Sequence, residues 1–316
     1  MKKKILGNTG IELGPLAFGG NVFGWTVDEK TSFQLLDGFI EAGLNLIDTA
    51  DSYSSWAPGN QGGESETIIG KWLMARGNRN QVVIATKVGW EITPEREGLK
   101  KDYIMTSVEG SLKRLQTDYI DLYQSHVDDA STPFQETLEA YSRLLDQGKI
   151  RAIGASNIKA NRLKEALAVS KEHGLPSYQT LQPEYNLYSR AGYEHELEGL
   201  VLENKIGVIC YSALASGFLT GKYRSKEDFS KSARGGGMQK FMNERGQRIL
   251  AALDVISAHH QATPAQVSLA WLMARPSITA PIASATSTEQ LQDLIKATQL
   301  TLTEHDIQRL NTASSY

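Results

Sequence analysis

Residues 45–56 read NLIDTADSYSSW, and this stretch decides the fold. The preceding Leu44 and residues 45–47 form a largely apolar run, typical of a buried strand, that leads directly into Asp48; a phenol follows at Tyr53. A buried carboxylate is costly unless an opposite charge or a hydrogen-bond donor pairs with it. Another part of the chain must therefore supply a partner for Asp48.

The same pattern, a short apolar run that ends in a polar residue, returns at equal intervals. VVIATK ends at Lys87 and IDLYQSH ends at His126, so the three polar residues stand at positions 48, 87 and 126. Each interval fits one strand, one helix and their connections. Repeated units of this kind call for parallel strands with helical crossovers, whose carboxyl ends meet on one face.

Eight β-rich runs alternate with segments of helical period. Strands are expected at residues 13–18, 44–48, 82–87, 120–126, 150–156, 180–182, 208–212 and 279–283, and helices at 31–42, 64–76, 102–115, 133–147, 159–171, 193–204 and 264–274. Eight units in 316 residues fit an α/β fold of the closed (β/α)8 TIM barrel type better than an open doubly wound sheet. Gly77, Gly148 and Pro264 stand where helices should end or begin.

No change of composition marks a linker, so we expect a single domain across residues 1–316. Residues 222–240 contain three consecutive glycines and many charges. They predict a long mobile excursion after the seventh strand.

Composition narrows the class of protein. A hydrophobic content of 41% and a charged content of 22% are those of a soluble globular protein. A net charge of −3 with interspersed signs argues against nucleic acid or a membrane as partner, and no apolar run approaches ~20 residues. We expect a small-molecule partner and a cytoplasmic location.

Cysteine and histidine usage gives no sign of a disulfide or a metal. The single cysteine, Cys210, lies in an apolar run and is expected to be buried. The histidines other than His126 lack metal-ligand spacing and are expected at the surface: His173, His195, His259, His260 and His305.

Asp48, Tyr53, Lys87 and His126 are chemically complementary and should share one rim of the barrel. A free phenol has a pKa of about 10, and an adjacent ammonium lowers it by stabilising the phenolate. We expect Lys87 to do this to Tyr53, and Asp48 to keep Lys87 charged. With His126 orienting a carbonyl oxygen, the group would form a general acid.

A general acid for a carbonyl needs a nucleophile. No G-x-S-x-G elbow and no G-x-G-x-x-G fingerprint is present, and residues 217–223 depart from the P-loop spacing. Hydride from a nicotinamide bound in another way would complete the reaction. Ser156, Asn157 and Gln182 suit a carboxamide, and Tyr211 could stack on a flat ring. Residues 212–217 and 284–290 offer backbone amides for phosphates, the latter before a helix.

These residues resemble the aldo-keto reductases over nearly the whole chain. The resemblance rests on NLIDTADSY, VVIATKVG, DLYQSHVDD, GKIRAIGASN, LQPEYNL and YSALASGFLTGKY, in that order. It implies a TIM barrel that reduces aldehydes or ketones with NAD(P)H, with Tyr53 as proton donor. It also implies cofactor contacts at Gly20, Asn21, Ser156, Asn157, Gln182, Tyr211, Ser212, Leu214, Ser216 and Lys222. In the segment 284–290, expected above to bind phosphate, Ser284, Thr286 and Gln290 are the candidate contacts.

Cofactor choice depends on one departure from the family pattern. Many relatives carry an arginine that pairs with the 2′-phosphate of NADP, whereas this chain has PIASAT with Thr286 at that place, as the potassium-channel β subunits carry a hydroxyl residue. Arg234 resembles another family arginine that could supply the cation. We expect NADP(H), with NAD(H) as the alternative.

Three tryptophans follow the first three strands in loops, at Trp25, Trp56 and Trp90. Aromatic walls suit an apolar carbonyl substrate, and loop packing is the alternative. Trp72 and Trp271 lie in helical patterns and are expected in the core.

Two other functions remain open from the sequence, together with the oligomeric state. Lys87 could form a Schiff base with a substrate, although Asp48 would then hold it in the wrong charge state. The chain could instead be a nucleotide-bound sensor or regulatory subunit with slow turnover, like the channel β subunits; His126 argues against this, because those relatives tend to depart from the tetrad there.

Overall fold

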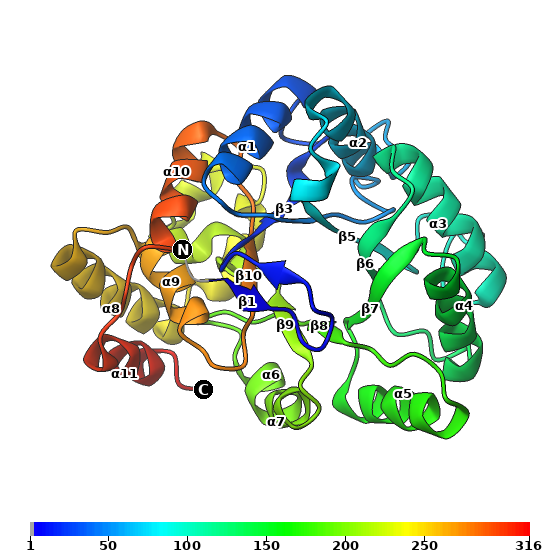
Figure 1. Cartoon of the computed structure of the whole chain (residues 1–316). Helices are drawn as coiled ribbons and strands as arrows, with labels where there is room; N and C mark the ends of the chain where they lie inside the picture. Colours follow the sequence, from blue (N-terminus) through cyan, green and yellow to red (C-terminus); the bar gives the residue numbers. More distant parts are fainter. Residues whose placement is uncertain (1–2) are drawn as a thin grey trace.

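The computed structural model describes residues 3–316, and its centre is a closed barrel of eight parallel strands (Figure 1). The wall follows the order β10-β3-β4-β5-β6-β7-β8-β9, so strands consecutive in the chain are neighbours. The barrel strands are β3 (Ala17–Gly19), β4 (Leu46–Asp48), β5 (Val83–Val88), β6 (Ile120–Ser125), β7 (Ile150–Ser156), β8 (Thr180–Gln182), β9 (Gly207–Cys210) and β10 (Ala280–Ala283). The predicted (β/α)8 barrel is confirmed.

Helices surround the barrel on its outer side (Figure 1). Those that the sequence predicted are α1 (Glu29–Glu41), α2 (Glu64–Arg76), α3 (Lys101–Leu115), α4 (Phe134–Asp146), α5 (Ala160–His173) and α9 (Pro264–Met273). The single helix expected at residues 193–204 is divided into α6 (Ala191–Glu196) and α7 (Glu198–Glu203), which meet at Leu197. The helix expected after the segment 284–290, without bounds, is α10 (Thr288–Ala297). Two further helices, α8 (Glu244–His260) and α11 (Glu304–Ala313), were not predicted. No helix within residues 3–316 has the length and apolarity needed to cross a bilayer.

A hairpin of β1 (Lys4–Ile5) and β2 (Glu12–Leu13) covers the amino end of the barrel (Figure 1). Gly7, with φ 53°, packs so closely that a Cβ there would lie 2.4 Å from the Gln179 carbonyl oxygen and 2.7 Å from the Gly207 amide nitrogen. These two residues stand at the starts of β8 and β9. The opposite end, where the strands finish, is left for the loops.

Several predicted boundaries shift in the structure. The expected strand 13–18 is interrupted after Leu13: β2 belongs to the hairpin and only β3 to the barrel. At Gly14, between them, the chain packs closely, because a Cβ there would lie 2.8 Å from the Leu44 side chain. Strand β9 ends at Cys210, and Tyr211 makes only an isolated bridge to Glu184. His126 lies one residue past the end of β6.

The excursion at residues 222–240 is partly ordered into 3-10 helices, η4 (Lys226–Lys231) and η5 (Gly235–Phe241). Ser225 and Asp228 form a capping box at η4, which gives local structure to a stretch without apolar period. Helix α8 follows, capped by the Asn243 side chain. The glycines and charges before α8 hid its start in the sequence.

The helices end and begin at the glycine and proline residues predicted from the sequence. Gly77 closes α2 in the left-handed region at φ 60°, and Gly148 adopts φ 69° after α4. At α9, Thr263 caps the helix and Pro264 occupies the first turn, where its missing N–H has no intrahelical role. These local signals fix the lengths of the crossovers.

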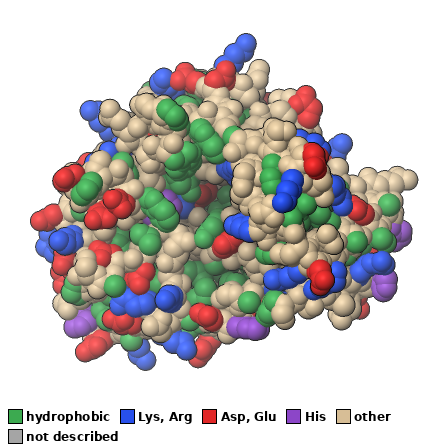
Figure 2. Space-filling model, turned by 180° about the vertical axis from the view of Figure 1, so that it is seen from behind, with side chains coloured by type: hydrophobic (Ala, Val, Ile, Leu, Met, Phe, Trp, Pro, Cys, Tyr) green, Lys and Arg blue, Asp and Glu red, His purple; other side chains and the backbone are tan. Residues whose placement is uncertain are grey.

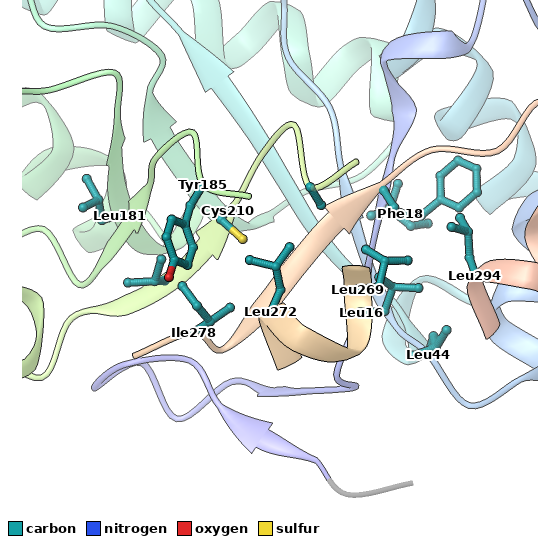
Figure 3. Close-up of a cluster of buried hydrophobic side chains, with 14 of the residues drawn as sticks. Leu16, Phe18, Leu44, Leu181, Tyr185, Cys210, Leu269, Leu272, Ile278 and Leu294 are labelled. Carbon is teal, nitrogen blue, oxygen red and sulfur yellow. The ribbon is translucent and has the colours of Figure 1, made fainter. Parts of the chain in front are cut away.

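Two apolar layers hold the barrel together. Small and branched side chains such as Leu46, Ala85 and Leu122 fill the barrel interior. A larger cluster packs between the strands and the helices, part of which Figure 3 shows with Phe18, Leu269 and Cys210. Because successive strand residues point to opposite sides, both layers come from the same strands. Trp72, Trp271 and Cys210 are buried, as predicted.

Close packing of α2 on α3 gives a test of the fold. A Cβ at Gly70 in α2 would lie 2.1 Å from the Arg114 carbonyl oxygen and 2.7 Å from the Leu115 carbonyl carbon. Because backbone must move to admit the methyl group, we expect Gly70→Ala to lower the free energy of unfolding in urea by about 1–3 kcal/mol.

Gly199 in α7 is the matched control, because nothing lies within 4 Å of a Cβ there. Gly199→Ala should leave the free energy of unfolding unchanged or raise it by up to about 1 kcal/mol. Equal stability of both variants would contradict the packing of α2 on α3.

Candidate active site

Three neighbouring strands bring the predicted acid, amine and imidazole to the carboxyl end of the barrel. Asp48 is the last residue of β4, Lys87 lies in β5, and His126 follows β6. The β4–β5 and β5–β6 pairs are parallel, with Asp48 opposite Ala85 and Lys87 opposite Gln124. The regular spacing along the chain therefore becomes proximity in space.

The Lys87 ammonium is held by three oxygens. It donates to Asp48 Oδ2 at 2.8 Å, to the Thr49 carbonyl oxygen at 2.6 Å and to Tyr53 Oη at 3.3 Å. Its side chain is fully buried and that of Asp48 is 4% exposed. Burial alone would lower the pKa of Lys87, but the Asp48 carboxylate beside it raises the pKa above its ordinary value. Lys87 is therefore a cation aimed at the phenol.

A second side chain, Gln182, fixes the other oxygen of Asp48. Gln182 Nε2 donates to Asp48 Oδ1 at 2.8 Å, across the barrel from β8. The sequence assigned Gln182 to cofactor binding and missed this role, because a contact between residues 48 and 182 leaves no pattern in the chain. Both Asp48 oxygens are thus occupied, which fixes the direction of the carboxylate.

Tyr53 differs from the expectation in one respect. Burial of the phenol raises the pKa of Tyr53 above 10, and the nearby Lys87 cation only partly opposes this. The sequence predicted a lowered pKa because it shows the ammonium but not the depth of the site. The raised pKa keeps Tyr53 protonated at neutral pH, so the phenol can donate its proton.

His126 lies beside the phenol as a neutral ring. Its ring centroid is 5.7 Å from that of Tyr53, and the side chain is buried. Burial first, and the Lys87 cation second, hold the pKa of His126 well below its ordinary value. Within residues 3–316 its Nδ1 has no hydrogen-bond partner. A neutral imidazole can accept or donate a single hydrogen bond at this place.

The three loop tryptophans gather around these groups. Trp90 lies 5.2 Å from His126 and Trp56 lies 5.5 Å from Tyr53, both as distances between ring centroids. Trp25 meets Trp56 edge to face at 5.9 Å. The carboxyl end of the barrel is hollowed near its centre, and hydrophobic side chains gather around the hollow (Figure 2). Trp56 and Trp90 are about half exposed and available to a ligand.

A chain of hydrogen bonds joins the polar residues proposed for the carboxamide. Tyr211 Oη donates to Asn157 Oδ1 at 2.8 Å, and Asn157 Nδ2 donates to the His126 carbonyl oxygen at 2.8 Å. Ser156 Oγ donates to the Gln182 carbonyl oxygen at 2.8 Å. The structure therefore brings Ser156, Asn157, Gln182 and Tyr211 together at the rim.

Unusual backbone conformations cluster in the same region. Asn157, Ser212, Ala215 and Ser216 have φ of 49°, 54°, 47° and 56°, a region that side-chain-bearing residues rarely occupy. Residues in such strained conformations concentrate at functional sites, where the surrounding contacts hold the backbone in place. Successive exposed amides in such a backbone can bind an anion. The segment containing Ser212, Leu214 and Ser216 thus has a conformation suited to phosphate.

A second polar segment lies between the first and last barrel strands. Ser284 Oγ donates to Asn21 Oδ1 at 2.7 Å, which ties the segment at 284–290 to the first loop. Gly20 packs so tightly that a Cβ there would lie 2.9 Å from Ser65 Oγ. Thr286 donates to Gln290 Oε1 at the start of α10. These residues form one continuous rim.

Lys222 and Arg234 bring positive charge from the segment after β9. The Arg234 guanidinium lies 5.5 Å from the Trp25 ring centroid, and Lys222 Nζ lies 5.0 Å from that of Tyr223. Burial lowers the pKa of Arg234, and its charge acts on Tyr53. Within residues 3–316 no carboxylate pairs with Arg234.

Two of the histidines expected at the surface lie close to a carboxylate. His259, His260 and Asp306 approach so that one ligand atom of each lies within 4.8 Å of the others, although the sequence showed no such spacing. Asp306 Oδ2, however, already accepts from His260 at 2.9 Å and from the Thr303 amide and hydroxyl. The cluster acts as a cap that joins α8 to α11.

The ion pair between Lys87 and Asp48 gives a test of the site. Asp48→Asn leaves a buried ammonium without a carboxylate, so we expect the free energy of unfolding to fall by about 3–5 kcal/mol. The double variant Asp48→Asn/Lys87→Met removes both charges and should lie closer to the parent. Urea unfolding of both variants measures this; a double variant less stable than the single one would contradict the pairing.

Comparison with known proteins agrees with the geometry. The model of the aldo/keto reductase family matches residues 15–315. Two proteins of Bacillus subtilis (strain 168) are each 35% identical: an uncharacterized oxidoreductase, YrpG, over 98% of this chain and 95% of its own, and the aldo-keto reductase YhdN, over 99% and 93%. A probable voltage-gated potassium channel subunit beta of Arabidopsis thaliana is 33% identical over 94% of this chain and 91% of its own.

This family consists of oxidoreductases that use NAD(P)H on small-molecule carbonyl compounds. The match covers every strand of the barrel and the whole rim described above. The chain belongs to the aldo/keto reductase family.

Proposed function

We propose that the protein reduces aldehydes or ketones to alcohols, with Tyr53 as the general acid. The observation that carries the proposal is the Lys87 ammonium, held by Asp48 and Thr49 and 3.3 Å from Tyr53 Oη. A protonated phenol beside a fixed cation can give its proton to an oxygen that gains negative charge, and the cation stabilises the phenolate left behind.

The residues at the rim fit a nicotinamide dinucleotide. The polar chain from Tyr211 to His126 offers hydrogen-bonding groups, and the left-handed backbone at Ser212 and Ser216 offers amides for phosphates. When bound, the cofactor supplies hydride to the carbonyl carbon. Ser156, Asn157 and Gln182 would hold its carboxamide, and Tyr211 would stack on its ring.

His126 orients the substrate in this mechanism. The neutral ring lies beside Tyr53 and Trp90, and it can donate one hydrogen bond to the carbonyl oxygen. Trp25, Trp56 and Trp90 then exclude water and contact an apolar group on the substrate. The substrate class we propose is therefore an apolar aldehyde or ketone. We also propose a cytoplasmic location.

Loss of the phenol tests the mechanism. We expect Tyr53→Phe to lower kcat for a panel of aldehydes by about 10²- to 10⁴-fold, because the variant loses the proposed general acid, while the Kd for the cofactor stays unchanged. Turnover is followed by the near-ultraviolet absorbance of the reduced nicotinamide. Activity that survives in Tyr53→Phe would refute Tyr53 as the acid.

Two alternatives predict different results in the same assays. A sensor or regulatory subunit, which the potassium-channel relative suggests, would bind the cofactor tightly but turn over slowly. A Schiff-base enzyme would be trapped on Lys87 by borohydride in the presence of substrate. The charged state of Lys87 disfavours the second alternative, because an ammonium is not a nucleophile.

Cofactor preference is tested at Arg234. We propose NADP(H), with Arg234 as the cation for the 2′-phosphate and Thr286 as a hydrogen-bond donor. If so, Arg234→Met should raise the Kd for NADPH about tenfold and leave the Kd for NADH unchanged. Calorimetric titration measures both. An equal rise for both cofactors would place the guanidinium on the pyrophosphate instead, and no change in either would remove Arg234 from the site.

A further inference from the structure

A group of polar side chains, two buried carboxylates with two partly buried partners, lies behind the proposed catalytic residues, between the barrel and its helices. It consists of Asp51 after β4, Glu66 in α2, and Ser107 and Arg114 in α3, and we call it the Asp51 cluster. Asp51 is 1% exposed and Glu66 is fully buried. Neither carboxylate takes part in the mechanism proposed above, so their burial calls for another reason.

The hydrogen bonds of the Asp51 cluster are incomplete. Asp51 Oδ2 accepts from Ser107 Oγ at 2.9 Å. Glu66 accepts from Arg114 Nε at 2.7 Å and from Thr86 Oγ1 at 2.6 Å. The remaining oxygen of Asp51, Oδ1, is buried and has no partner among the residues that the structure describes. The single guanidinium is thus already engaged by Glu66.

The charges of the Asp51 cluster do not balance. Two carboxylates face one arginine, and the other groups that act on Asp51 are Arg96 before α3, Tyr103 in α3 and Tyr123 in β6. Burial, and then the charge of Glu66, raise the pKa of Asp51 to about 7, against the opposing effects of Ser107, Arg114 and Arg96. Asp51 therefore keeps its proton below about pH 7 and loses it above.

The cluster supports the backbone around Tyr53 from two sides. The Asp51 amide donates to the Lys87 carbonyl oxygen at 3.1 Å, so Asp51 continues the ladder between β4 and β5. On the other side, the Tyr53 carbonyl oxygen accepts from the Gly63 amide at 2.8 Å. Gly63, at φ 90°, packs against Arg114, where a Cβ would lie 2.4 Å from Cδ. Movement of Asp51 or Arg114 would therefore move Tyr53 relative to Lys87.

We propose that Asp51 is a positioning residue, which holds Tyr53 against Lys87 when the Asp51 cluster carries one proton and releases it when that proton is lost. The inference rests on the proposed function of Tyr53. Loss of the proton leaves two buried negative charges beside one guanidinium, and their repulsion is relieved by displacement of the loop that carries Asp51.

The sign of the pH dependence follows from the raised pKa. The folded protein retains a proton on Asp51 up to about pH 7, whereas an unfolded chain releases it near pH 4. The structure is therefore destabilised as the pH rises between these values, and Asp51 is ionised in the folded protein above about pH 7. Asp51→Asn keeps the side chain neutral at every pH and nearly the same in shape.

The first experiment compares kcat of Asp51→Asn and of the parent, both saturated with cofactor and aldehyde, across the pH range. Burial raises the pKa of Tyr53, so below the pH at which this phenol ionises the ratio of the two values reports the ionisation of Asp51. We expect a ratio near one below about pH 6, which rises at least about threefold above pH 8, because small displacements of a reacting group cost much rate. A ratio that does not change with pH overturns the proposal.

Glu66→Gln is the matched variant, because it removes the like charge while Asp51 remains. In Glu66→Gln, kcat should decline at a lower pH than in the parent, and the decline should be smaller. The reason is that one carboxylate then faces one guanidinium. A variant that merely loosens the structure would lower kcat at every pH alike. An unchanged profile in Glu66→Gln would contradict the charge balance on which the proposal rests.

A second readout needs no turnover. The phenol of Tyr53 is titrated by ultraviolet absorbance, as the difference between each protein and its Tyr53→Phe counterpart. We expect the midpoint to be lower in Asp51→Asn than in the parent, because Lys87 stays beside the phenol when Asp51 cannot ionise. Equal midpoints overturn the proposal. If the parent reduces no aldehyde, only the proposed function fails, and this titration still decides the role of Asp51.

Discussion

The buried pair of Lys87 and Asp48 is the interaction on which the site depends. Two charges taken out of water are tolerated only when their remaining donors and acceptors are satisfied. Here the Thr49 carbonyl, Tyr53 and Gln182 satisfy them, so the pair fixes the positions of groups from β4, β5, β8 and the loop after β4. The barrel makes this feasible, because it brings distant parts of the chain to one rim.

Much of this arrangement could be predicted from the sequence. The equal spacing of Asp48, Lys87 and His126 predicted three consecutive strands and their meeting point, because strand register converts sequence periodicity into proximity. What could not be predicted depends on burial. The depth of Tyr53 reverses the expected direction of its pKa shift, and the contact of Gln182 with Asp48 crosses the barrel without any pattern in the chain. Helix α8 was missed because the glycines and charged residues before it hid its start.

Several features of the site lower the stability of the folded protein. A buried ion pair, a second buried carboxylate at Asp51 and left-handed residues at Asn157, Ser212 and Ser216 each oppose folding. The apolar layers inside and outside the barrel wall offset these costs. The unfavourable features share one end of the barrel, and the opposite end is covered by the hairpin of β1 and β2.

The proposed catalytic groups and the proposed aromatic wall of the substrate site belong to different parts of the scaffold. Asp48 and Lys87 lie on strands, whose positions are fixed by the ladder, whereas Trp25, Trp56 and Trp90 lie on connecting loops. Loops tolerate insertion and substitution far better than barrel strands do. During divergence, such a chain can therefore exchange one range of carbonyl compounds for another by changing its loops, while the proposed proton-donating groups on the strands are inherited unchanged.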